Sequence, residues 1–120
     1  MKDEFWVYLQ QLVDTSEIIV DRPKGSIHHR YPTSPYPFDY GYLKGTTSAD
    51  GAEIDIWIGT LGKKEVVGVL CTVDLLKRDT ELKVLCDCTS KQVEAILDFI
   101  NQGQMRGIMI PKDQQEGAEQ

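Results

Sequence analysis

Short runs in which apolar and polar residues alternate, separated by turn residues, constrain the fold of this chain most strongly. The clearest run covers residues 53–59, where Ile54, Ile56 and Ile58 alternate with polar or aromatic neighbours. Successive side chains of a strand point to opposite faces of a sheet, so this run predicts a strand with one buried face. Further runs predict strands at residues 16–20, 40–44, 65–74 and 81–88, and the apolar residues 105–110 are also capable of forming one.

Two other segments have the spacing of an amphipathic helix. In residues 3–13, apolar side chains recur every three or four positions. The second segment begins at Thr89, which resembles a capping box together with Gln92, and its apolar positions continue to Ile100.

These elements predict a β-rich α+β fold. Short strands with one helix before them and one after them indicate a small five-stranded OB-like β-barrel, with flanking helices at the N-terminus and near the C-terminus. With 120 residues, 41% of them hydrophobic, the chain is long enough for one core. We therefore expect a single domain over residues 1–110 and a flexible polar tail over residues 111–120.

The charge balance argues against two classes of partner. The chain carries 13 Lys and Arg against 19 Asp and Glu, a formal charge of −6. Nucleic acids and anionic membranes need a basic face, so neither is expected as the main partner. The N-terminus lacks the apolar core of a secretory signal, and no window approaches the roughly 18 apolar residues of a membrane helix. The protein is accordingly predicted to be cytoplasmic.

Three cysteines, Cys71, Cys86 and Cys88, cannot all pair within one chain. Their expected state is reduced and buried, as in a cytosolic protein, with Cys86 and Cys88 on the same face of a strand. An alternative is a zinc site formed by these two thiols with His28 or His29, although the spacing is not that of common zinc sites.

Two pairs of aspartates have the same spacing. Asp50 and Asp55 lie five residues apart at the start of one predicted strand, and Asp74 and Asp79 lie five apart around a turn. If the two hairpin ends are adjacent, four carboxylates meet at one mouth of the barrel, and a divalent cation such as Mg²⁺ would balance their charge. The alternative is that each is an ordinary turn or surface aspartate.

Tyr36 and Tyr40 flank a proline and precede Gly41. Their phenols can hydrogen-bond phosphate oxygens without adding charge. The alternative is that both rings pack in the wall of the barrel.

Four segments together resemble the soluble family I inorganic pyrophosphatases. They are residues 21–26 (DRPKGS), residues 36–42 (YPFDYGY), residues 50–56 (DGAEIDI), and residues 67–70 (VGVL) followed by Asp74 and Asp79. The resemblance implies a five-stranded OB-like barrel, dependence on Mg²⁺ with Mn²⁺ as an alternative ion, and hydrolysis of diphosphate or a related phosphate compound. It also implies a small phosphate-containing ligand such as pyrophosphate, and a homo-oligomer.

The resemblance also implies roles for particular residues. Asp50, Asp55, Asp74 and Asp79 match metal-binding positions. Tyr36 and Tyr40 match active-site tyrosines, Asp21 stands where the family has Glu, and His29 stands where it has Lys, which gives four candidate catalytic residues. Arg30 and Lys24 do not match family positions, but they could supply positive charge in place of missing family groups, so they are candidates for binding the substrate phosphate.

Several residues depart from the family pattern. Ala52 stands where the family signature has its middle aspartate, which helps to activate water. Glu81 stands where the family has a lysine after the last metal-binding aspartate. The hairpin that carries a phosphate-binding arginine is missing. Lys83 shares a strand face with Glu81, so we expect an ion pair between them.

Three functional interpretations remain open from the sequence. One is a weakened Mg²⁺-dependent diphosphatase or a relative acting on another phosphate ester. Another is a catalytically silent protein that binds metal or a phosphorylated ligand. The third is an OB-like interaction module.

Overall fold

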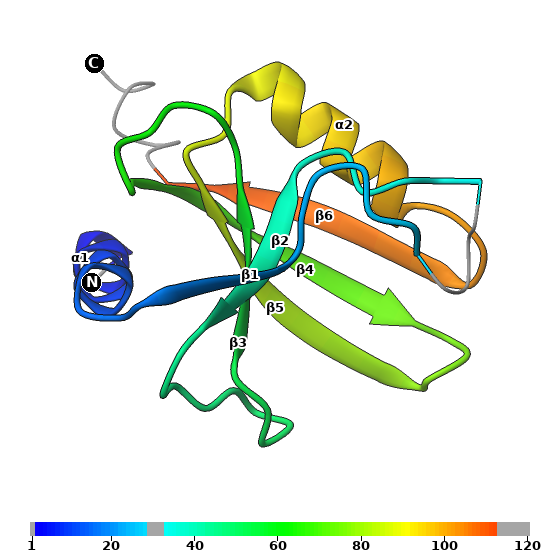
Figure 1. Cartoon of the computed structure of the whole chain (residues 1–120). Helices are drawn as coiled ribbons and strands as arrows, with labels where there is room; N and C mark the ends of the chain where they lie inside the picture. Colours follow the sequence, from blue (N-terminus) through cyan, green and yellow to red (C-terminus); the bar gives the residue numbers. More distant parts are fainter. Residues whose placement is uncertain (1, 29–32, 113–120) are drawn as a thin grey trace, which may run out of the picture.

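The computed structural model describes residues 2–28 and 33–112, and they form one sheet with two helices (Figure 1). The elements, in chain order, are α1 (Lys2–Asp14), β1 (Ile18–Arg22), β2 (Asp39–Leu43), β3 (Ile54–Ile58), β4 (Val66–Asp74), β5 (Asp79–Cys86), α2 (Ser90–Ile100) and β6 (Met105–Pro111). Both predicted helices and the predicted strands are confirmed. No helix among these residues is long and apolar enough to span a membrane.

The sheet has six strands in the order β1-β2-β3-β5-β4-β6. The β3–β5 pair is parallel and the other neighbouring pairs are antiparallel, so the sheet is mixed. Among the described residues β1 and β6 are the two edges and do not pair with each other. The prediction of a closed, five-stranded barrel is therefore wrong in both strand number and closure.

The sixth strand explains the difference. β6 pairs with β4 along its whole length, from Gly68 opposite Pro111 to Asp74 opposite Met105. Its other edge is poorly suited to a further strand, because the Gly107 N–H donates to Asn101 Oδ1 at 2.9 Å and Pro111 has no N–H to donate. The sheet thus stays open at β6. Pro111 lies in this strand, so the predicted polar tail begins after it, and residues 113–120 lie outside the described part of the chain.

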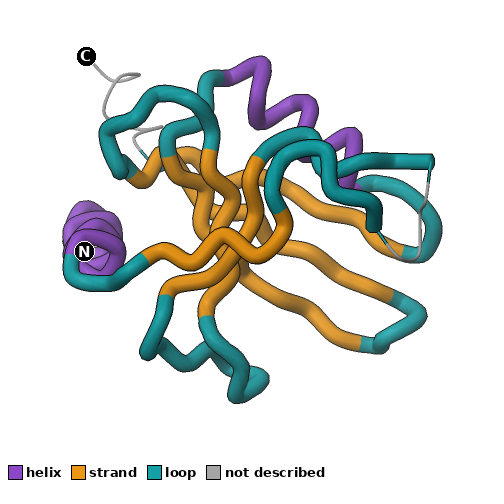
Figure 2. The backbone as a smooth tube through the Cα atoms, in the orientation of Figure 1, coloured by secondary structure: helices purple, strands orange, loops and turns teal. Residues whose placement is uncertain are grey.

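The core lies on both faces of the sheet. On one face, Trp6 and Val13 of α1 pack with strand residues such as Ile56 and Val84. On the other, α2 packs against residues that include Trp57 and Leu85. Figure 2 shows the two helices at separate places around the sheet. The neighbours Ile56 and Trp57 belong to different clusters, so the alternation predicted for residues 53–59 is confirmed.

The first residues of α2 show the predicted capping box. The Gln92 N–H donates to Thr89 Oγ1 at 3.2 Å, and the Thr89 N–H donates to Gln92 Oε1 at 3.0 Å. These two bonds satisfy backbone donors that the helix itself leaves unpaired.

Cys86 and Cys88 lie on opposite faces of the sheet, so the prediction that they share a face is wrong. Asp87 between them has a φ of 58°, in the left-handed region, and this breaks the alternation of the strand. Cys86 joins the cluster around α1 and Cys88 the cluster around α2. Both thiols are buried and free, as expected, and Cys71 is free and half-buried.

Candidate functional site

A lysine lies at the centre of the candidate site. Lys83 of β5 is only 8% exposed, and its ammonium donates to three oxygens from three different strands. Its Nζ lies 2.9 Å from Asp55 Oδ2 of β3, 2.9 Å from Glu81 Oε1 of β5, and 2.7 Å from Tyr40 Oη of β2. The predicted ion pair between Glu81 and Lys83 is therefore confirmed. We call these four residues the lysine network.

Sheet topology assembles the lysine network. Asp55 stands opposite Tyr42 in the antiparallel β2–β3 pair, which places it diagonally beside Tyr40. β5 then lies parallel to β3, with Ile56 opposite Val84, so Lys83 comes next to Asp55. The side chains meet because they all extend from the face of the sheet that α2 partly covers.

The network keeps both Lys83 and Tyr40 protonated. Burial opposes the charged form of Lys83, but the attraction of Tyr40 and Asp55 and the hydrogen bond to Glu81 outweigh it, so its pKa is raised. Burial also raises the pKa of Tyr40, and Asp55 adds to that shift while Lys83 opposes it. At neutral pH the site therefore holds an ammonium and a neutral phenol, and Tyr40 is not a phenolate base.

An aromatic wall stands beside the network. The ring centroid of Tyr36 lies 5.6 Å from that of Tyr40, 5.7 Å from that of Trp57 and 4.9 Å from that of Phe99. Burial raises the pKa of Tyr36, although the nearby Arg22 guanidinium opposes that shift. Both rings therefore pack in an aromatic wall, and the Tyr40 hydroxyl accepts from Lys83; hydrogen bonding of the two phenols to phosphate stays a prediction.

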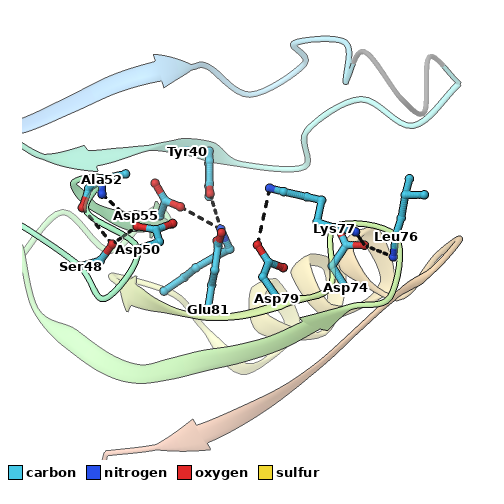
Figure 3. Close-up of polar contacts among 11 residues, drawn as sticks. Tyr40, Ser48, Asp50, Ala52, Asp55, Asp74, Leu76, Lys77, Asp79 and Glu81 are labelled. Atoms are coloured by element: carbon cyan, nitrogen blue, oxygen red, sulfur yellow. Dashed lines mark hydrogen bonds and ion pairs between the residues drawn. The ribbon is translucent and has the colours of Figure 1, made fainter.

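The four aspartates lie in a row rather than around one point (Figure 3). Asp50 is in the loop before β3, where its Oδ1 accepts from the Ser48 hydroxyl and, at 2.9 Å, from the Ala52 N–H; these bonds lower its pKa. Asp50 and Asp55 line a hollow of about 440 Å³. Asp74 and Asp79 line a different hollow, of about 400 Å³.

Asp74 and Asp79 are engaged in the turn between β4 and β5. Asp74 is 1% exposed, and its Oδ1 accepts from the Leu76 N–H at 2.9 Å and the Lys77 N–H at 3.2 Å. Asp79 lies 4.0 Å from the Lys77 ammonium. Glu81 of the lysine network lines both hollows and so stands between the two pairs of aspartates.

This arrangement does not fit a divalent metal ion. Within residues 2–28 and 33–112, no three His, Cys, Asp or Glu side chains form a group that could hold one. The carboxylates have the right chemistry for Mg²⁺, but two of them, Asp55 and Glu81, are already bound to an ammonium. Metal binding by Asp50, Asp55, Asp74 and Asp79 stays a prediction.

The remaining candidate residues lie apart from the lysine network or outside the described chain. Asp21 is exposed on β1, and the Lys24 N–H donates to Asp39 Oδ1 at 2.8 Å while its ammonium lies 5.4 Å from the centre of the Phe38 ring. His29 and Arg30 are outside the described residues, so their roles stay predictions. The alternative zinc site is not supported by the cysteines, because Cys86 and Cys88 face opposite sides.

Sequence reasoning missed two features of this site. Arg22, next to Tyr36, follows Asp21 directly, and nothing in its spacing points to the tyrosine. The contacts of Lys83 with Asp55 and Tyr40 depend on the parallel pairing of β3 with β5, which no local sequence pattern reveals. Only the Glu81–Lys83 spacing carried a signal.

Comparison with known proteins supports a pyrophosphatase-like fold. No family model matches the chain, and no curated protein matches it. Among solved structures, an inorganic pyrophosphatase from Coxiella burnetii matches with a TM-score of 0.57 and 15% identity, covering 78% of this chain and 82% of that one. An inorganic pyrophosphatase from Helicobacter pylori gives 0.57 and 14% identity, covering 78% and 81%, and one from Thermus thermophilus gives 0.56 and 16% identity, covering 78% of each chain. At these identities the similarity is one of fold.

Proposed function

We propose that this protein is a catalytically silent relative of the inorganic pyrophosphatases that binds a small phosphate-containing ligand. The fold and the two tyrosines support the ancestry and the ligand class. The lysine network is the observation that carries the loss of catalysis, because it occupies Asp55, Glu81 and Tyr40 with one another.

Family residues that this chain lacks also argue for a loss of catalysis. Ala52 replaces the carboxylate that would help to activate water, and it lies exposed in a loop, where its N–H donates to Asp50. A diphosphate hydrolase needs cations to neutralise the charge that develops on the phosphate oxygens, and a base for the attacking water. This chain has Ala52 in place of the carboxylate and Glu81 in place of a lysine. Each such loss is expected to lower the rate of pyrophosphate hydrolysis by a factor of about 10².

The charge of the 400 Å³ hollow narrows the ligand class. Among the described residues, its lining includes the carboxylates Asp74, Asp79 and Glu81, the lysines Lys77 and Lys83, and His28. A bare phosphate dianion would meet three carboxylates and two ammonium groups among these described side chains. A phosphate ligand that arrives with its own cation, such as the Mg²⁺ complex of pyrophosphate, suits this lining better.

Calorimetry with two forms of one ligand tests the binding. We expect heat from the Mg²⁺ complex of pyrophosphate and little from pyrophosphate in a chelator. Lys77→Met should weaken binding about tenfold by removing an exposed cation from the hollow, whereas Lys91→Met, exposed on α2, should leave it unchanged. Absence of binding for both forms would contradict the proposed ligand.

A phosphate-release assay tests the loss of catalysis. Wild-type protein with pyrophosphate and Mg²⁺ or Mn²⁺ should release phosphate feebly or not at all. Turnover typical of efficient enzymes would contradict the proposed loss of catalysis. A cytoplasmic location and a homo-oligomeric state remain predictions, and sedimentation of the purified chain tests the second.

A further inference from the structure

The geometry points to Lys83 as the resident cation of this site: its ammonium takes the place of a divalent metal ion between Asp55 and Glu81 and keeps such ions out. This inference concerns metal ions alone, and it stands whether or not a phosphate ligand binds. It explains why Asp55, which matches a metal-binding position of the resembled family, is found in an ion pair instead.

The contacts of Lys83 resemble those of a coordinated cation. Its Nζ lies 2.7–2.9 Å from oxygens of Tyr40, Asp55 and Glu81, which belong to three strands. A divalent ion on Asp55 or Glu81 would bind at about 2.1 Å from a carboxylate oxygen. The ammonium, held against the same carboxylates, would then face a second positive charge at short range.

Lys83 is held in place by its surroundings. The residue is 8% exposed and extends from the middle of β5, between β3 and β4. Its ammonium also lies 5.2 Å from the centre of the Tyr40 ring, a favourable position for a cation. Releasing it would leave a buried charge without its partners, which is costly.

The position of the lysine network also hinders a metal ion from bridging the two pairs of aspartates. Glu81 lines both hollows, whereas Asp50 and Asp55 line only one and Asp74 and Asp79 only the other. By holding Glu81 and Asp55 together, Lys83 occupies the boundary between the two pairs of aspartates. A metal ion that bridged the pairs would have to displace it.

Titration with Mn²⁺ alone, by calorimetry, tests the inference. Wild type and Lys83→Arg, which keeps the cation, should bind at most weakly, whereas Lys83→Met should bind about tenfold more tightly or better. In Lys83→Met/Asp55→Asn the gained binding should be lost. Wild-type binding as tight as that of Lys83→Met, or no gain in a folded Lys83→Met, would overturn the inference.

A measurement on the wild type covers the case in which Lys83→Met does not fold. With Mn²⁺ at equimolar concentration, paramagnetic broadening should spare the NMR signals of Tyr40, Asp55 and Glu81. Broadening centred on these residues would overturn the inference, and its loss in Asp55→Ala/Asp79→Ala would support the sequence-based metal site. Because no phosphate is present, failure of this test is distinct from failure of the proposed ligand binding.

Discussion

Asp87 is the residue on which the start of β4 depends. It is 4% exposed, and its carboxylate accepts hydrogen bonds from the N–H groups of Lys63, Lys64 and Glu65 at 3.1, 2.9 and 3.0 Å. Replacing Asp87 by Ala leaves these donors without their acceptor, and hydrogen bonds to charged groups are strong. We expect Asp87→Ala to lower the free energy of unfolding by about 3 kcal/mol.

Urea denaturation measures this loss. Asp98→Ala is the matched control, because Asp98 is an exposed aspartate on α2, and it should change the unfolding free energy by less than about 0.5 kcal/mol. Equal effects of the two substitutions would show that the Asp87 hydrogen bonds contribute no special stability.

The two buried cysteines give a prediction about pH. Burial, with a smaller effect of Asp87, raises the pKa of Cys86 to about 12, and burial raises that of Cys88 to about 11. At pH 8 about one Cys88 in a thousand is a thiolate, so native protein should react with a thiol reagent at Cys71 alone, as mass spectrometry would show. Labelling of Cys86 or Cys88 at the rate of Cys71 would contradict the burial.

The same shifts set the direction of an alkaline effect on stability. The folded chain holds the protons of Cys86 and Cys88 more tightly than the unfolded chain, whose thiols have a pKa near 9.0. Stability should therefore fall as the pH rises above about 9, because only the unfolded chain then loses these protons.

At the scale of single residues, the sequence allowed part of the site to be predicted. The Glu81–Lys83 pair followed from spacing on one strand, because residues two apart share a face. The break at Asp87 did not follow, because a left-handed aspartate in an apolar run looks like any other strand position. Tertiary hydrogen bonds to Lys63, Lys64 and Glu65 hold that conformation.

Among the elements, the pairing of β1 with β2 depends on Gly41. A Cβ at this position would lie 1.8 Å from the backbone oxygen of Ile19, and Val20 stands directly opposite in the register. Backbone cannot yield as a side chain can, so Gly41→Ala should separate β1 from β2. We expect a loss of about 3 kcal/mol or more, measured by thermal or urea unfolding.

Gly107 in β6 is the matched control. Its Cβ would lie 3.1 Å from a methyl group of Ile100, which can shift by a few tenths of an ångström. Gly107→Ala should therefore cost about 1 kcal/mol. A milder effect at Gly41 than at Gly107 would contradict the close β1–β2 approach.

The strands were predictable as elements, but their arrangement was not. Alternation located residues 53–59 well, since one face had to be buried. Residues 105–110 gave only a short apolar run, and pairing with β4 decided that they form an edge strand. The order β3-β5-β4 depends on contacts between distant segments, so the open sheet could not be inferred from local patterns.

The whole molecule has a formal charge of −6, and carboxylates also outnumber the lysines described at the candidate site. The aspartates are divided between two hollows, and Lys83 pairs with Asp55 of one hollow and with Glu81, which lines both. A resemblance in the sequence could identify the aspartates, but it could not show which cation balances them. The fold is therefore pyrophosphatase-like, and at the site of this chain the Lys83 ammonium pairs with two carboxylates.

Introducing two residues of the resembled pyrophosphatase pattern into this chain tests the role of Lys83. Ala52→Asp/Glu81→Lys supplies the missing carboxylate and lysine, but Lys83 then remains on Asp55 and a second ammonium is added beside it. We expect no gain in Mg²⁺-dependent phosphate release from pyrophosphate. Adding Lys83→Met should free Asp55, and release should rise about tenfold or more over the double variant.

The double variant is the control for the triple one, because the two differ only at Lys83. Circular dichroism and unfolding should first show that both are folded. If the double variant alone gained as much activity as the triple, Lys83 would not be the group that blocks the site. If the folded triple variant gained nothing, the three substitutions would be insufficient, and the missing arginine hairpin would be the larger loss.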